Sequence, residues 1–277
     1  MVLGQYALNL ASPDGIDLFI LTSVLISLAL LPICLSRRPA PDFEAPQPIS
    51  LRETYQASPL GVIAVTITGL SGGIIFAIGP VYALQTGMNI GQIANFMAIF
   101  VIGGMCAQLP LGYLSDRIER RKLILLISFI AALASLGCAL SVSNLALLNL
   151  FFFLSGTTGL SIYALGAAYT NDHLERSQFV GASSMLILVN GCGAFAGPFL
   201  ASVFMGIYGP EAFFPLVSAI FASITLFALY RAQISPESAP VDEQVPLMSV
   251  PPRATTIVAQ IAEETENDAR QDRNLKL

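Results

Sequence analysis

Two long stretches without charge constrain this chain more than any other feature. No Asp, Glu, Lys or Arg occurs at residues 54–115 or at residues 123–171. Apolar runs of roughly 20 residues that lack charges indicate membrane-spanning helices. Only 11% of all residues are charged, whereas about a quarter would be usual in a soluble domain. Because a backbone in lipid must satisfy its hydrogen bonds within each helix, the chain is predicted to be an all-α integral membrane protein.

Seven membrane-spanning helices are predicted from the apolar runs and the polar segments between them. The second and the sixth contain several glycines and a proline, so we expect both to be interrupted. The predicted spans are residues 16–36, 59–84, 90–111, 123–142, 145–169, 179–208 and 213–230.

The spans divide the chain into four predicted regions. Residues 1–36 hold the start of the chain and the first helix, and residues 37–58 form a linker with several prolines. Within that linker, ISLRETYQ is predicted to form a short surface helix. Residues 59–231 form a six-helix bundle. Residues 232–277 are acidic and rich in proline, a composition typical of a disordered tail.

The positive charges indicate the orientation in the membrane. All 13 Lys and Arg residues lie in the linker, at residues 112–122, between the fifth and sixth spans, or from Arg231 onward. The alternate connections and the N-terminal segment contain none. Since basic residues are enriched on the cytoplasmic side, we expect an external N-terminus and a cytoplasmic C-terminus, in a plasma (inner) membrane.

Residues 112–122, GYLSDRIERRK, carry six charged residues between the two uncharged stretches and are called the charged segment below. Asp116 precedes Arg120 by one helical turn, which is near enough for an ion pair. A carboxylate here is also suited to face the N-terminus of a neighbouring helix. The charges therefore have two interpretations: an anchor that sets topology, or a contact that holds helices together in one state of a cycle.

The charged segment resembles the G-x-L-x-D-R-x-G-R-R/K motif of major facilitator superfamily transporters. The sequence departs from that motif at Glu119, where glycine is usual. In the family, the motif joins the second and third helices of each six-helix half and helps to latch the outward-open state. The matching residues, to which the resemblance assigns this latch role, are Gly112, Leu114, Asp116, Arg117, Arg120 and Arg121.

The position of the motif implies which part of such a transporter the chain resembles. Spans two to seven correspond to the family's helices seven to twelve, and the first span corresponds to helix six. We therefore expect the C-terminal half of a transporter, from a partial or truncated protein. The implied activity is movement of a small solute across the bilayer by alternating access, with protons as a candidate coupling ion. A missing N-terminal half or a second copy is the candidate protein partner.

Uncharged polar residues in the predicted spans are candidates for contact with the solute. The resemblance places the second and fifth spans beside the cavity, so Tyr82 and Tyr163 are the first choices. The alternative is that these side chains form hydrogen bonds between helices. The candidates are Tyr82, Gln85, Asn95, Tyr163 and Asn190.

Glycines and prolines mark two spans as close-packed or flexible. Small residues let helices approach closely, and a proline frees a backbone carbonyl and bends the helix. The residues are Gly69, Gly73 and Pro80 in the second span, and Gly193, Gly197 and Pro198 in the sixth. The lone His173 is expected to be a solvated loop residue between the fifth and sixth spans.

The sequence offers little for other classes of protein. It contains no recognisable nucleophile–base pair, phosphate-binding loop or metal cluster, and its four cysteines form no CxxC pair. We therefore expect no enzyme activity, metal or cofactor. No basic patch with interleaved aromatic residues indicates nucleic-acid binding. Two alternatives to a partial or truncated transporter stay open. One is a non-transporting membrane sensor or assembly protein that kept the fold, and the other is a half-transporter that dimerises.

Overall fold

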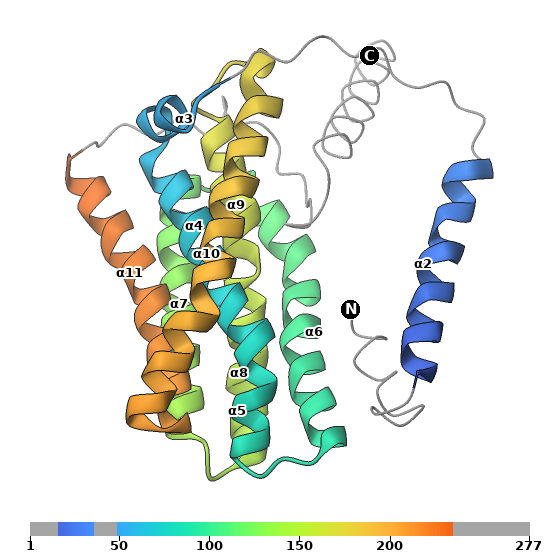
Figure 1. Cartoon of the computed structure of the whole chain (residues 1–277). Coiled ribbons are helices and arrows are strands. Elements are labelled where there is room, and N and C mark those ends of the chain that lie inside the picture. The colour runs from blue at the N-terminus through green and yellow to red at the C-terminus, as the bar shows by residue number, and fades with distance from the viewer. Residues whose placement is uncertain (1–15, 36–48, 235–277) are drawn as a thin grey trace.

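The structure, a computed structural model, describes residues 16–35 and 49–234, and every regular element in these ranges is helical (Figure 1). A bundle of long helices lies together, and one N-terminal helix, α2, lies apart from it. The elements are α2 (Asp17–Leu35), α3 (Leu51–Ala57), α4 (Pro59–Gly73), the π-helical turn η1 (Ile74–Ile78), α5 (Gly79–Gln85), α6 (Ile90–Ser115), α7 (Arg120–Leu140), α8 (Leu145–Gly159), α9 (Ser161–Asn171), η2 (Arg176–Gln178), α10 (Phe179–Tyr208), η3 (Pro210–Ala212) and α11 (Phe213–Ile234).

Six helical segments in the described residues are long and apolar enough to cross a membrane. They confirm the predicted spans two to seven as membrane-length helices, and they are Pro59–Gln85, Ile90–Ser115, Arg120–Leu140, Leu145–Asn171, Phe179–Tyr208 and Pro210–Ile234. The first predicted span is also helical, as α2, but its apolar stretch Phe19–Ala29 is shorter. The start of the chain, most of the linker and the tail from residue 235 lie outside the described residues.

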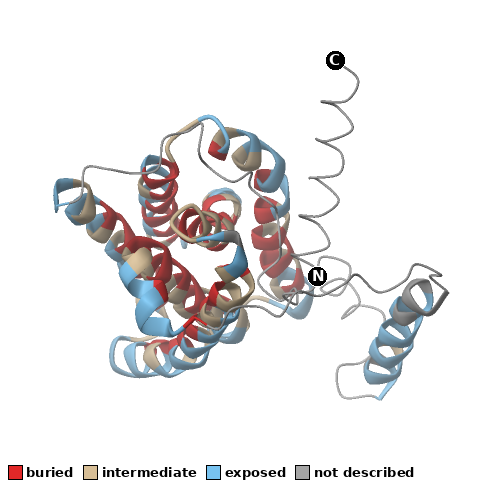
Figure 2. Ribbon diagram, turned by 90° about the horizontal axis from the view of Figure 1, so that it is seen from above, coloured by how far each residue is buried: buried red, intermediate tan, exposed pale blue. Residues whose placement is uncertain are grey.

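The bundle buries residues on its inner faces and exposes residues on its outer surface (Figure 2), and many of the exposed residues are large and apolar. Leu109 is 86% exposed and Phe195 is 73% exposed, although both are large and apolar. Such a surface is unfavourable in water but suited to lipid, which solvates apolar groups. The chain is accordingly an integral membrane protein.

Helices α4 and α10 are packed against each other through glycines. A Cβ atom added at any of four glycines would overlap a backbone carbonyl oxygen of the opposite helix. Small residues of this kind let two helix backbones approach closely. The four contacts are Gly69 against Asn190, Gly73 against Ala194, Gly193 against Thr66, and Gly197 against Leu70.

The interruptions differ from those predicted. In the second span, the π-helical turn η1 separates α4 from α5, and Pro80 lies in the first turn of α5, which confirms an interruption there. The predicted break in the sixth span is wrong, because α10 continues without interruption through Pro198. Gly193 and Gly197 of this helix face α4 and allow close packing. The fifth span is unexpectedly divided at Leu160, between α8 and α9.

The structure also shows the short helix in the linker and the C-terminal end of the last helix. The predicted surface helix is confirmed as α3, which Ser50 and Glu53 cap reciprocally. The hydrogen bond from the Ser50 backbone N–H lowers the pKa of the Glu53 carboxyl, because it favours the charged form. The predicted boundary at residue 231 is too early, since α11 continues to Ile234.

Replacing Gly69 with alanine is expected to destabilise the bundle, because the new methyl group must push α4 away from the Asn190 carbonyl. Overpacking of this kind costs about 1–3 kcal/mol. Gly72 is the matched control: it lies on the same helix, and nothing is within 4 Å of its added Cβ. The midpoint of thermal unfolding in detergent should fall for Gly69→Ala and not for Gly72→Ala. Equal midpoints for the two variants would show that the close contact does not stabilise the fold.

Candidate functional site

The predicted spans end at residue 111 and begin again at residue 123, which makes all of the charged segment a connecting loop, but most of the segment is helical. Helix α6 continues through Gly112 and Leu114, and α7 begins with Arg120 and Arg121. Only residues 116–119 connect the two helices. The prediction of a loop is therefore wrong for most of the motif. Hydrogen bonds at the helix ends continue into the connection, which keeps this turn tight.

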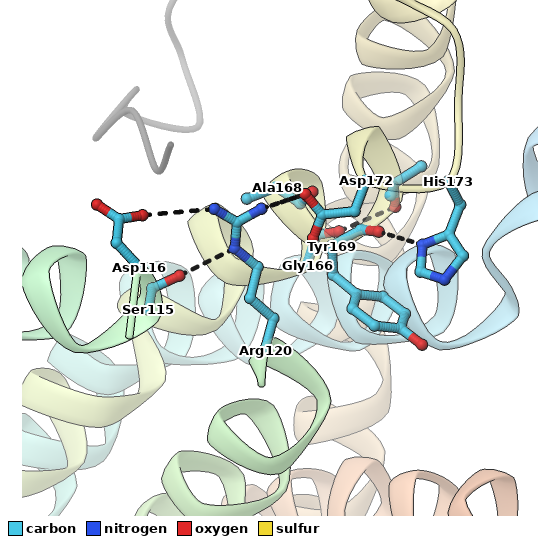
Figure 3. Close-up of polar contacts among 9 residues, drawn as sticks. Ser115, Asp116, Arg120, Gly166, Ala168, Tyr169, Asp172 and His173 are labelled. Atoms are coloured by element: carbon cyan, nitrogen blue, oxygen red, sulfur yellow. Dashed lines mark hydrogen bonds and ion pairs between the residues drawn. The ribbon is translucent and has the colours of Figure 1, made fainter. Parts of the chain in front are cut away.

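Arg120 is the centre of this end of the bundle (Figure 3). Its side chain has no exposed surface, and its Nη1 forms an ion pair with the carboxylate of Asp172, whose side chain is 1% exposed. The same nitrogen lies 3.4 Å from the carbonyl oxygen of Ala168, and Nε donates to Ser115 Oγ at 3.0 Å. Nη2 lies 3.5 Å from Asp116 Oδ1. We call these five residues the Arg120 cluster.

The cluster compensates a charge that water does not reach. Removing a guanidinium from water costs several kcal/mol, which only well-placed opposite charges and acceptors offset. Asp172 supplies the charge, and the Ala168 carbonyl belongs to the last turn of α9, where a helix end is partly negative. The first residue of α7 is thereby bound to the ends of both α6 and α9.

Asp116 differs from Asp172 in its exposure. Its side chain is 45% exposed, and it stands at the C-terminal end of α6. The structure brings it to Arg120, as the spacing suggested. Ion pairs in contact with water contribute only about 0–1 kcal/mol. The cluster therefore has a buried part around Asp172 and an outer carboxylate at Asp116.

The remaining charges of the segment lie around this centre. Glu119 stands where the family has glycine, with φ −51° and ψ 116°, a backbone conformation open to any residue. Its carboxylate lies 3.3 Å from Arg121 Nε and 2.8 Å from Lys122 Nζ. Arg117 faces outward, with its guanidinium 4.1 Å from the centre of the Tyr113 ring.

The candidates for solute contact do not form one group. Tyr82, on α5, is 1% exposed and stacks on Phe213 with 4.8 Å between ring centres. Tyr163, on α9, is 7% exposed and belongs to a different cluster that includes Val65. The first two choices are therefore both buried, in separate parts of the bundle.

The three amide candidates also have different surroundings. Asn190 donates from Nδ2 to the carbonyl oxygen of Val65 at 3.0 Å, which links α10 to α4. Val65 also packs near Tyr163, so these two candidates share a neighbour. Asn95 is half-buried on α6, and Gln85 is exposed at the end of α5.

Sequence reasoning missed Asp172, Ser115 and Ala168 as parts of the site. Asp172 did carry a signal, because it is the first charge after a long uncharged stretch.

The prediction for His173 was wrong in part. Its ring is half-buried, and Nδ1 lies 2.7 Å from the carbonyl oxygen of Tyr169.

Comparison with known proteins gives the family of this helical membrane bundle. A family model described as Major Facilitator Superfamily matches residues 61–262. The chain belongs to the major facilitator superfamily. The family points to a transporter and not to an enzyme.

Individual relatives agree with the family. The chain is 27% identical to an uncharacterized MFS-type transporter of Enterobacter sp. (strain 638). The matched region of 233 residues covers 83% of this chain and 59% of the relative. An uncharacterized MFS-type transporter of Yersinia pestis (strain Pestoides F) is 24% identical, over 83% of this chain and 59% of that protein. The chain thus spans about three fifths of the length of these relatives. No solved structure matches it.

Removing the charge of Asp172 should destabilise the fold strongly, because it removes the buried carboxylate that pairs with the buried guanidinium of Arg120. Breaking a buried pair costs about 3–5 kcal/mol, whereas Asp116→Asn should cost about 1 kcal/mol or less. Unfolding can be followed by alkylation of the buried Cys138 thiol, with the other cysteines replaced. Equal unfolding midpoints for Asp172→Asn and Asp116→Asn would contradict the division of the cluster into buried and outer parts.

Proposed function

We propose that the chain is the C-terminal part of a secondary transporter that moves a small solute by alternating access. Its charged end faces the cytoplasm, and its N-terminus lies outside a plasma membrane. The family and the length of the relatives support this assignment. The observation that carries it is the Arg120 cluster, since the motif residues form an organised contact between helix ends.

The proposed role of the cluster follows from its two parts. The buried pair of Arg120 and Asp172 keeps the ends of α7 and α9 together throughout the cycle. The outer carboxylate of Asp116 meets a second helical bundle in one state and leaves it in the other. The partner bundle is an N-terminal half or a second copy. In this arrangement the charged segment is both the topological anchor and the latch.

The proposed solute path lies beside the two interrupted spans. Transporters bind their solutes near the middle of the membrane, where interrupted helices expose backbone groups. Here α4, η1 and α5 form one interrupted span, α8 and α9 form the other, and α4 packs against α9. Tyr163 and Asn190 share Val65 as a neighbour near this contact.

Helix α5 is proposed to be the moving part of this path. The π-helical turn η1 and Pro80 separate it from α4, which glycines bind to α10. Bending at η1 would carry Tyr82 and Gln85 while Gly73 and Gly197 keep the rest of α4 in place. Tyr82, buried in the described state, would reach the solute only after this movement. Asn95, on the neighbouring α6, completes the proposed path.

Replacing Asp116 with asparagine in the complete transporter is expected to slow solute uptake about tenfold, the size of a typical coupling between states. Membrane insertion should be unaffected, because the basic residues that set topology are retained. The solute is first identified by screening uptake into proteoliposomes. Glu175→Gln is the control, since Glu175 is an exposed carboxylate in the connection that follows α9. Wild-type uptake by the Asp116→Asn variant would reduce the charged segment to an anchor.

A further inference from the structure

Ser115 is the buried hydroxyl at the end of α6. The residue has no exposed surface, and its Oγ accepts a hydrogen bond from Nε of Arg120 at 3.0 Å. It occupies an unspecified position of the family motif, and neither its charge nor its size marks it in the sequence. Its place against the guanidinium gives it a specific effect on Arg120.

The effect follows from the geometry of the guanidinium group, which is planar and directs its N–H groups rigidly. Nε and Nη2 face the consecutive residues Ser115 and Asp116 at the end of α6. Nη1 faces Asp172 and the Ala168 carbonyl at the end of α9 (Figure 3). Holding Nε on the hydroxyl therefore fixes the direction in which Nη1 points.

Without the hydroxyl, the two carboxylates would compete for the same group. The Nε–H would lose the acceptor that Ser115 supplies, and a buried donor without a partner costs about 1–3 kcal/mol. With Nε no longer held, the guanidinium can turn until Asp116, already 3.5 Å from Nη2, accepts from Nη1 and Nη2 together in the bidentate geometry that arginine and carboxylates favour. That rotation would draw Nη1 away from Asp172 and loosen the end of α9.

We infer that Ser115 is a positioning residue that keeps Arg120 bound to α9 and limits Asp116 to a weak outer contact. The latch carboxylate is thereby released without disturbing the buried pair. This inference rests on the proposed function, in which Asp116 changes partners during transport. Its physical content concerns only the orientation of Arg120 and is testable without transport.

Hydrogen–deuterium exchange of the full chain in lipid nanodiscs measures the protection of the last turn of α9, which contains Ala168. Ser115→Ala should speed exchange there about tenfold, because Arg120 turns to Asp116 and the helix end opens locally. Ser115→Thr keeps the hydroxyl and should exchange like the parent chain. A peptide from the contact of α4 with α10 is the internal reference and should stay protected.

The double variant Ser115→Ala/Asp116→Asn separates positioning from simple structural support. Removing the competing carboxylate should return Arg120 to Asp172, so that exchange at the end of α9 slows again toward the parent rate. If the Ser115 hydroxyl only fills space, exchange at the end of α9 should stay fast in the double variant, because the second substitution restores no volume. Unchanged exchange in Ser115→Ala, or fast exchange that Asp116→Asn does not slow, would overturn the inference.

If Ser115→Ala does not fold, Ser115→Cys repeats the test with a similar side chain and a weaker acceptor, and the same rescue is required. The exchange result is independent of the uptake result. If Asp116→Asn slows exchange at the end of α9 in the Ser115→Ala chain but by itself leaves solute uptake normal, Ser115 is the positioning residue and the latch role of Asp116 is contradicted. Impaired uptake by Asp116→Asn without rescue in exchange would keep the latch and exclude the role of Ser115.

Discussion

The burial of one guanidinium group organises the charged end of this bundle. Arg120 has no exposed side-chain surface, so its charge must be compensated by groups that the protein itself supplies. Asp172 provides the opposite charge, and Ser115 and the Ala168 carbonyl accept from the other N–H groups. These acceptors belong to the ends of α6 and α9. The contacts that compensate the charge of Arg120 therefore also hold the ends of α6, α7 and α9 together.

The interior of the bundle is held together by close packing of helix backbones and not by charges. Helices α4 and α10 meet through glycines against backbone carbonyls, with no ionic group at the contact. Helix α9 connects the two regions, because it packs against α4 and carries Asp172 at its end. Close packing suits the part of the helices surrounded by lipid, where small residues favour association. The charge cluster lies at the end of the spans, where one of its carboxylates is accessible to solvent.

Much of this arrangement was predictable from the sequence, for identifiable reasons. Uncharged runs predicted seven membrane-spanning helices because lipid excludes charge, and six helices of the described residues are long and apolar enough to cross a membrane. Fixed spacing identified the motif around Asp116. The glycines marked the second and sixth spans as close-packed or flexible, but that α4 and α10 pack against each other is seen only in the structure. The partner of Arg120 was missed because Asp172 is 52 residues away, and only tertiary structure brings the two together. The division of the fifth span at Leu160 was missed because no proline marks it. The aromatic rings around Tyr82 were missed because they come from two other helices, α6 and α11.

The central claim is that Arg120 holds the end of α9 to the end of α6. Spin labels at the exposed positions Tyr113 and Glu175 would report the distance between these ends by pulsed electron paramagnetic resonance on the full chain in nanodiscs. The expected result is a narrow distance distribution in the parent chain and a broad one after Arg120→Leu, which removes the cation from the cluster. Narrow and identical distributions in both chains would contradict the claim.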